Sequence, residues 1–303
     1  MRIVIAKESG FCFGVRRALD KINSLTTDRS KQIYVLGELI HNRDIINNLK
    51  KKGIVFIDNL KKIKKTKKIN KKNKKENKTK EKVLVISAHG VSDKVLAEAK
   101  KRGLKIVDTT CPLVRRVHHI TKKLEKDGYR IIIFADKTHT ETKGIKGNLS
   151  FPIIIEKLSE LNKINIENSR NKKYRKYALV FQTTQDLELL EKINSLAKKK
   201  IKNIKVIDTI CSATKARQKS AKELARKVDM MLVVGGYNSA NTKRLRQICS
   251  RIVKTKHIEN ENQLKKSWFK GKKRIGITAG ASTPEETILK VVKNINLLQS
   301  KNL

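Results

Sequence analysis

Two seven-residue segments of this chain are nearly identical, and both end in a cysteine. They are "KIVDTTC", which ends at Cys111, and "KVIDTIC", which ends 100 residues later at Cys211. Cys12 lies 99 residues before Cys111 and closes a similar apolar segment, "RIVIAKESGFC". A pattern that recurs at a fixed period is the signature of a repeated structural unit. The sequence therefore predicts one unit written three times.

Each unit predicts the same order of strands and helices. An apolar strand leads to the cysteine, a basic helical pattern follows it, and two further strand and helix pairs complete the unit. Near-continuous apolar strands that alternate with helices are typical of parallel sheets covered on both faces. We therefore expect an α/β fold of three repeated β-α-β units in a pseudo-threefold arrangement around one centre, with units at 1–103, 104–202 and 203–303.

Polar side chains follow the second and third predicted strands of every unit. In parallel sheets, ligands bind beyond the carboxyl ends of the strands, so these side chains are expected to meet at the centre. Imidazoles, hydroxyls and amides near the starts of helices suit an anion such as a diphosphate. The expected ring consists of His41, His89, His139, Thr183, Ser239, Asn241 and Ser282.

The three repeated cysteines point to a metal centre. One cysteine alone is most often a packed core thiol, but three at equivalent positions of a repeat are not explained by packing. Disulfide pairing would leave one thiol over, and structural zinc usually takes four ligands from closely spaced pairs. Three thiolates suit an iron–sulfur cluster better. We expect one 4Fe–4S cluster per chain on Cys12, Cys111 and Cys211, with one iron lacking a protein ligand.

Glu141 is the one acidic residue in the expected ring, two residues after His139. A carboxylate beside a bound diphosphate would have its pKa raised by the like charge and by the exclusion of water. Glu141 is therefore a candidate proton donor. On spacing alone, a surface glutamate remains the alternative.

At these residues the sequence resembles a known family. The segments "GFCFGVRRAL", "GELIHNRDII", "SAHGVS", "DTTCPLV", "HTE", "QTT", "CSATKARQ", "NSAN" and "TAGAS" resemble the IspH (LytB) family, the 4-hydroxy-3-methylbut-2-enyl diphosphate reductases. The resemblance implies a three-domain α/β trefoil around a 4Fe–4S-type cluster. It implies reductive removal of the allylic hydroxyl with two electrons and two protons. The products are isopentenyl and dimethylallyl diphosphates, in the last step of the methylerythritol phosphate route to isoprenoids.

By motif position, the resemblance also implies roles for single residues. Glu141 would deliver protons, and Thr183 would help hold the hydroxyl end of the substrate. The chain departs from the family at Ala240, where the family usually has a serine that contacts the diphosphate. The implied cluster ligands are Cys12, Cys111 and Cys211, and the implied diphosphate contacts are His41, His89, His139, Ser239, Asn241 and Ser282.

The composition leaves a second class of function open. Lys and Arg number 72 against 28 Asp and Glu, a net charge of +44, which is typical of nucleic-acid-binding proteins. The segment 61–82 holds 13 lysines and is expected to be a flexible insert. Aromatic residues are only 4%, and no zinc finger or RNP-type motif is present, so no specific nucleic acid is expected. Quinolinate synthase, another three-cysteine cluster enzyme, is the alternative among enzymes.

The sequence also predicts partners and a compartment. It has no flavin or nicotinamide fingerprint, so a flavodoxin or ferredoxin is expected as electron donor, and a basic surface would speed encounter with such acidic proteins. No segment approaches the ~18 consecutive apolar residues that cross a membrane, and no signal peptide is expected. Four cysteines in 303 residues are too few for a disulfide scaffold, so we expect a cytoplasmic protein.

Overall fold

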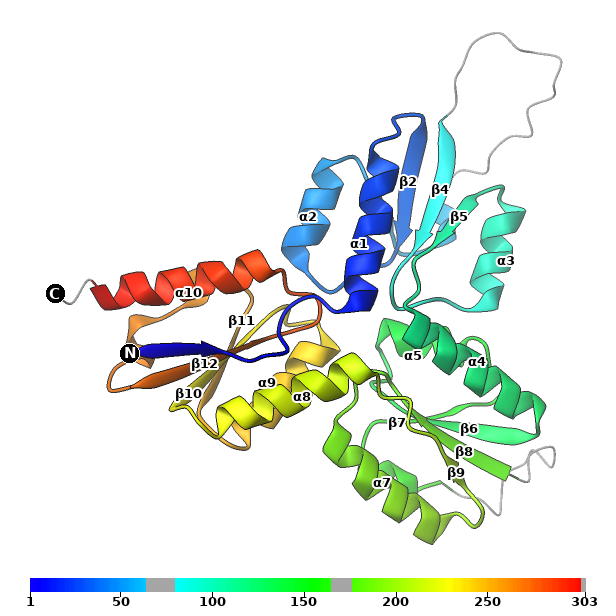
Figure 1. Cartoon of the computed structure of the whole chain (residues 1–303). Helices are drawn as coiled ribbons and strands as arrows, with labels where there is room; N and C mark the ends of the chain where they lie inside the picture. The colour runs from blue at the N-terminus through cyan, green and yellow to red at the C-terminus, as the bar shows by residue number, and fades with distance from the viewer. Residues whose placement is uncertain (64–79, 165–175, 301–303) are drawn as a thin grey trace.

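The computed structural model describes residues 1–63, 80–164 and 176–300. In this part of the chain, three four-stranded sheets radiate as three lobes from a common centre (Figure 1). Every strand pair is parallel, and helices cover the sheets. The predicted α/β trefoil with parallel sheets is confirmed.

The three sheets share one strand order, with two inner strands, namely β2 and β4, β6 and β8, or β10 and β12, and one edge strand on either side. The first lobe has the order β3-β2-β4-β5, the second β7-β6-β8-β9, and the third β11-β10-β12-β1. The strands are β1 (Arg2–Ile5), β2 (Lys31–Leu36), β3 (Val55–Ile57), β4 (Glu81–Ile86), β5 (Lys105–Asp108), β6 (Tyr129–Phe134), β7 (Ile153–Ile155), β8 (Lys176–Phe181), β9 (Lys205–Val206), β10 (Met230–Val234), β11 (Thr255–Ile258) and β12 (Arg274–Ala279).

The strand that leads to each cysteine belongs to the neighbouring lobe. β5 pairs with β4 and β9 pairs with β8, so each is the edge strand of the sheet before it. β1 pairs with β12, with Arg2 opposite Arg274, and so carries the N-terminus into the third lobe (Figure 1). The sheets are therefore offset by one strand from the sequence ranges 1–103, 104–202 and 203–303. As a result, each cysteine lies where the chain crosses between two lobes.

The helices begin near the carboxyl ends of the strands, which face the centre, and run back toward the outer ends of the sheets. Gly128, with φ +85°, follows the last turn of α4, where a glycine commonly ends a helix. The helices are α1 (Phe13–Thr26), α2 (Arg43–Lys51), α3 (Asp93–Lys101), α4 (Pro112–Lys126), α5 (Thr140–Lys146), α6 (Leu158–Asn162), α7 (Leu187–Lys200), α8 (Ser212–Ala225), α9 (Ala240–Ser250) and α10 (Glu285–Ser300).

Each sheet has a hydrophobic core on both faces, which explains the continuous apolar runs. In β4, Val83 and Val85 pack under α1 and α2, while Leu84 and Ile86 pack under α3. The apolar face of α1, formed by Val15, Leu19 and Ile22, is buried in the first of these cores. Two cores flank the second sheet and two flank the third. The rigid sheets thus hold the loops at their carboxyl ends in fixed positions.

The lysine-rich insert is only partly described. Residues 64–79 lie outside the described residues. The ends of the predicted loop 61–82 are structured instead: Leu60–Lys62 form a short 3-10 helix, and β4 already begins at Glu81. These ends are ordered because Ile63 is buried in the first lobe and Glu81 pairs with Lys31 of β2. Across the described residues, the model contains no helix that combines the length and the hydropathy of a membrane span.

Candidate active site

The loops beyond the central strands meet around one cavity of about 710 Å³. Its walls come from all three lobes, and every predicted site residue lies in them. The eleven predicted side chains in the wall are Cys12, His41, His89, Cys111, His139, Glu141, Thr183, Cys211, Ser239, Asn241 and Ser282. Ala240 lies there as well, together with Thr184, Thr214 and Arg217.

The three cysteines occupy equivalent positions at the starts of three helices. Cys12, Cys111 and Cys211 are the N-cap residues of α1, α4 and α8. Each backbone N–H donates to a carbonyl in the loop after a central strand, at 3.0 or 3.1 Å; the acceptors are Ala281, Ala88 and Thr183. The repeat in the sequence therefore becomes a repeat in hydrogen bonding, which fixes the cysteines around one axis.

The surroundings of the thiols suit metal binding. Burial raises the pKa of Cys111 and of Cys211, which disfavours free thiolates. The positive ends of three helices oppose this effect, as would a bound metal. Cys211 Sγ also accepts a hydrogen bond from the backbone N–H of Thr214 at 3.3 Å. Three soft sulfur donors at helix N-termini, facing one cavity, fit the ligand set of an iron–sulfur group.

Close packing around the cysteines depends on Gly14. A Cβ at this position would lie 2.6 Å from Sγ of Cys111, well inside contact distance. Only glycine therefore lets α1 approach the second cysteine.

Cys249, by contrast, is fully buried in the third lobe, where burial raises its pKa to about 12. It packs as a core thiol.

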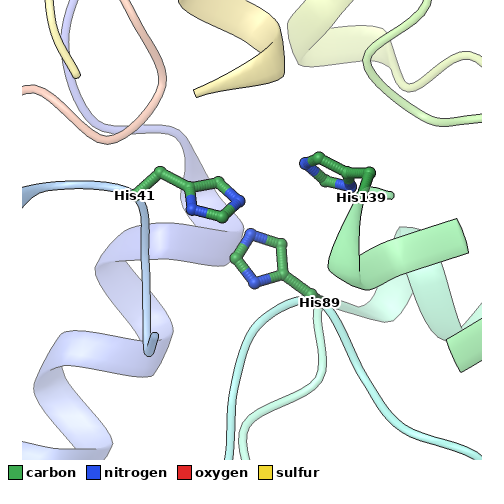
Figure 2. A group of neighbouring side chains, drawn as sticks. All are labelled: His41, His89 and His139. Carbon is green, nitrogen blue, oxygen red and sulfur yellow. The ribbon is translucent and has the colours of Figure 1, made fainter. Parts of the chain in front are cut away.

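Three histidines from three loops lie against one another (Figure 2). They line the same cavity as the three cysteines. The ring centroid of His41 lies 4.4 Å from that of His89 and 5.2 Å from that of His139, and the remaining pair is 5.5 Å apart. One nitrogen of each ring lies within 4.8 Å of the others, a spacing that can also hold a metal ion. Glu38 anchors His41 by accepting its Nδ1–H at 2.8 Å.

The electrostatics of this histidine cluster favour the neutral forms of His89 and His139. Burial, with the nearby His41 and His139, holds the pKa of His89 well below its ordinary value. Burial, with His41 and Lys243, lowers the pKa of His139 to about 3. His139 Nδ1 accepts the backbone N–H of Glu141 at 3.2 Å, which leaves the proton of the neutral ring on Nε2. The rings can therefore donate hydrogen bonds to an anion in the cavity.

Glu141 is buried, and the surface alternative is wrong. Its side chain is 2% exposed and lies in the first turn of α5. Its two carboxyl oxygens accept hydrogen bonds from the backbone N–H and from the hydroxyl of Thr183, both at 2.7 Å. Burial raises the pKa of Glu141 despite these two bonds. The carboxyl group is thus held rigidly and disposed to carry a proton.

The third lobe adds hydrogen-bonding groups to the cavity. Ser239 caps α9 by accepting the N–H of Thr242 at 3.3 Å. The Ser282 hydroxyl donates to the carbonyl of His41 at 3.0 Å and ties the third lobe to the first. Asn241 is 4% exposed, and among the described residues its Nδ2 has no hydrogen-bond partner. An unpaired buried amide beside a helix N-terminus is ready to bind an anionic ligand.

Sequence reasoning missed four residues of this site, of which Arg217 is the most informative. Arg217 is 4% exposed, and its guanidinium donates to the carbonyls of Gly10 at 2.7 Å and Ala213 at 3.1 Å. A signal for it exists: six residues after the other two cysteines stand Ala18 and Val117, both buried. Because the equivalent positions in the other two units are buried, an arginine at this position is expected to be buried as well. The other missed residues are Glu38, Thr184 and Thr214.

Comparison with known proteins identifies the family of this chain. A family model described as LytB protein matches residues 3–296 of the chain. The chain belongs to the LytB family. Among curated members, the 4-hydroxy-3-methylbut-2-enyl diphosphate reductase of Campylobacter hominis is 40% identical over 98% of this chain and 100% of its own length. That of Wolbachia pipientis is 38% identical over 94% of this chain and 88% of its own.

Solved structures of the LytB family share the fold. The E-1-hydroxy-2-methyl-but-2-enyl-4-diphosphate reductase of Plasmodium falciparum matches with a TM-score of 0.86 at 29% identity, over 98% of this chain and 87% of that one. A second structure, described as the terminal enzyme of the non-mevalonate pathway, matches with a TM-score of 0.64 at 34% identity, over 98% of this chain and 100% of the other.

Proposed function

We propose that this chain reduces 4-hydroxy-3-methylbut-2-enyl diphosphate to isopentenyl and dimethylallyl diphosphates, the last step of the methylerythritol phosphate pathway. The observation that carries the proposal is the meeting of three helix-capping cysteines, three histidines and a buried glutamate in one cavity. Two relatives named above support it, because both are named as this reductase and the match covers 88% or more of their length.

In this proposal, Cys12, Cys111 and Cys211 hold one 4Fe–4S cluster, and one of its irons has no protein ligand. When bound, the cluster supplies electrons and a Lewis-acidic iron for the substrate hydroxyl. The protein keeps the thiolates at the positive ends of α1, α4 and α8, which lowers the cost of their ionisation.

The diphosphate is bound by His41, His89, His139, Ser239, Asn241 and Ser282. The histidine spacing would also suit a metal ion, but the surroundings are cationic. The buried Arg217, the nearby Lys243 and the N-termini of α5 and α9 all favour an anion over a divalent cation. The Nδ2 of Asn241, which has no partner in the part of the chain that the structure describes, gains one when the diphosphate binds. Ala240 offers no hydroxyl, so its backbone alone contributes.

Glu141 donates a proton as the C–O bond breaks. Its raised pKa keeps a proton on the carboxyl at higher pH than usual, and the two hydrogen bonds with Thr183 hold it in place. Thr183 in turn lies between Glu141 and the backbone of Cys211, whose N–H it accepts at 3.0 Å. The hydroxyl end of the substrate is therefore held between Thr183 and Glu141.

The two electrons come from a flavodoxin or ferredoxin in the cytoplasm, since a net charge of +44 favours encounter with acidic carriers. No specific nucleic acid and no membrane takes part. A generic nucleic-acid-binding protein would have no use for the cavity, and quinolinate synthase is not among the relatives reported above.

The test is turnover under anaerobic conditions after reconstitution with iron and sulfide. We expect the parent protein to convert the allylic diphosphate into both five-carbon diphosphates when a small-molecule reductant is supplied. Cys211→Ala should abolish turnover, whereas the matched variant Cys249→Ala should retain it, because Cys249 lies outside the cavity. Absence of product from reconstituted parent protein that contains iron would refute the proposal.

A further inference from the structure

One ion pair that recurs beside two of the three cysteines is missing at Cys12, among the residues that the structure describes. Four residues after each cysteine stands a basic side chain: Arg16, Arg115 or Lys215. Arg115 pairs with Asp108 at 2.8 Å, and Lys215 pairs with Asp208. Both acids lie three residues before a cysteine, where the first repeat has Ser9 instead. Arg16 is exposed, and among the described residues it forms no ion pair.

An exposed aromatic side chain lies beside Arg16. Phe13 is 70% exposed, more than any other large hydrophobic residue in the described part of the chain. It is the first residue of α1 and follows Cys12 directly. Both neighbours of Phe13, Cys12 and Gly14, line the central cavity, but Phe13 does not. Its ring therefore lies on the outer side of the chain that forms the cavity wall.

Phe13 and Arg16 belong to a shallow groove along α1, which we name the α1 groove. Its empty space is about 750 Å³, and it is lined by Phe13, Arg16, Arg17, Asp20, Lys21 and Ser24. Arg17 is already engaged, since it donates to the carbonyl of Thr110 at 3.1 Å. Helix α1 begins near the centre of the molecule, where α1, α4 and α8 converge, and extends outward (Figure 1); the residues that line the groove run along it from Phe13 to Ser24.

We propose that the α1 groove docks an acidic protein that carries one electron at a time. The groove combines the exposed aromatic side chain of Phe13 with more basic side chains than acidic ones, since Asp20 is its one acid. This combination is complementary to an acidic partner that has an apolar contact at its redox centre. The proposal rests on the proposed function, in which Cys12 holds the cluster. A carrier in the groove contacts Phe13, the residue bonded to that ligand, which brings its redox centre close to the proposed cluster site.

The electron balance requires two encounters for each substrate molecule. Each reduced carrier is oxidised by one electron and leaves, and two such transfers supply the two electrons that cleave the C–O bond. A carrier that must leave after each transfer needs a small interface with fast association. Exposed cations serve this need because they steer the encounter without a large buried area.

The experiment compares binding and turnover in matched variants, with an acidic flavodoxin as the probe. Arg16→Glu is compared with Lys198→Glu, an exposed lysine in the last turn of α7, and Phe13→Ala with Phe151→Ala, an exposed phenylalanine of the second lobe. The dissociation constant is measured by calorimetry at low and high salt. Turnover is then measured with flavodoxin and, separately, with reduced methyl viologen, a small donor that needs no docking surface.

We expect Arg16→Glu to raise the dissociation constant and the KM for flavodoxin about tenfold at low salt. Phe13→Ala should raise both about fivefold at any salt, since its contribution is apolar. The two control variants and every turnover rate with methyl viologen should stay at parent values. Failure of the parent with methyl viologen would refute the proposed function, whereas the binding data would still test the groove.

Equal flavodoxin affinity in the parent and Arg16→Glu would overturn the docking proposal. So would self-association or RNA binding of the parent that Arg16→Glu abolishes while flavodoxin affinity is unchanged. A neutral variant, Arg16→Gln, keeps the test valid if charge reversal disturbs the helix. It should show an intermediate loss of affinity.

Discussion

Replacement of Glu141 by glutamine removes the acidic proton of this side chain but preserves its size and most of its hydrogen bonds. The variant therefore distinguishes a role of Glu141 in proton transfer from a role in stability. The carboxyl oxygens of Glu141 accept two hydrogen bonds from Thr183, from the N–H and from the hydroxyl, both at 2.7 Å. In Glu141→Gln, the amide oxygen can keep the first bond, and the amide N–H₂ can donate to the Thr183 hydroxyl in place of the second. The change in stability should therefore stay within about 1 kcal/mol.

The effect on catalysis should be far larger. Removing a general acid costs about 10²- to 10⁴-fold in rate, equivalent to roughly 3–5 kcal/mol of transition-state stabilisation. We expect kcat of Glu141→Gln to fall by about this factor at unchanged iron and sulfide content. The KM should change little, because the diphosphate is bound by other residues.

The role of Glu141 also predicts the direction in which kcat changes with pH. Burial raises the pKa of Glu141, so the protonated, active form persists to higher pH than an ordinary glutamate would allow and is lost as the pH rises through that raised value. The parent kcat should fall on the alkaline side, and this limb should be absent from the residual activity of Glu141→Gln. A kcat within threefold of the parent at neutral pH, with matched cluster content, would refute the assignment of Glu141 as proton donor.

Other side chains of the cavity give equally specific expectations. Gly14→Ala would place a Cβ 2.6 Å from Cys111 Sγ, an overpacking that costs about 1–3 kcal/mol of stability. The iron content of this variant should fall, although its circular dichroism spectrum should match that of the parent. Full iron content would contradict this prediction. Asn241→Ala removes an amide whose Nδ2 has no hydrogen-bond partner among the described residues. It should leave the melting temperature nearly unchanged and raise the KM for substrate about 10- to 100-fold; an unchanged KM would remove Asn241 from the site. His139 has its pKa lowered to about 3 in the free protein, and a bound anion would raise it. Inorganic diphosphate should therefore bind with proton uptake, and the ratio of parent to His139→Asn affinity should grow as the pH falls from 8 to 6; a constant ratio would contradict the reasoning.

Much of the site could be predicted because the repeat aligns three loops at once. Cys12, Cys111 and Cys211 align the three repeats with one another. The alignment then identifies the polar residue that follows each equivalent strand. Parallel sheets bring those ends together, so side chains far apart in sequence were expected in one cavity. Burial of Glu141 could not be predicted in the same way, because it depends on Thr183 of a different loop.

The exchange of strands between lobes was not visible in the sequence. β1 and β12 are at opposite ends of the chain, and hydrophobic pattern alone does not choose a strand's partner. The edge strands β3, β7 and β11 have only three or four residues, too few for a periodic signal. Arg217 was missed for another reason: a basic residue in a basic helix is expected at the surface.

The most direct test of the central claim is the iron and acid-labile sulfide content of protein purified without oxygen. The parent should hold about four irons and four sulfides per chain. Cys249→Ala should match the parent, and Cys12→Ala should lose most of both. Metal-free parent protein after reconstitution, or equal iron in Cys12→Ala and the parent, would contradict the assignment of the three cysteines.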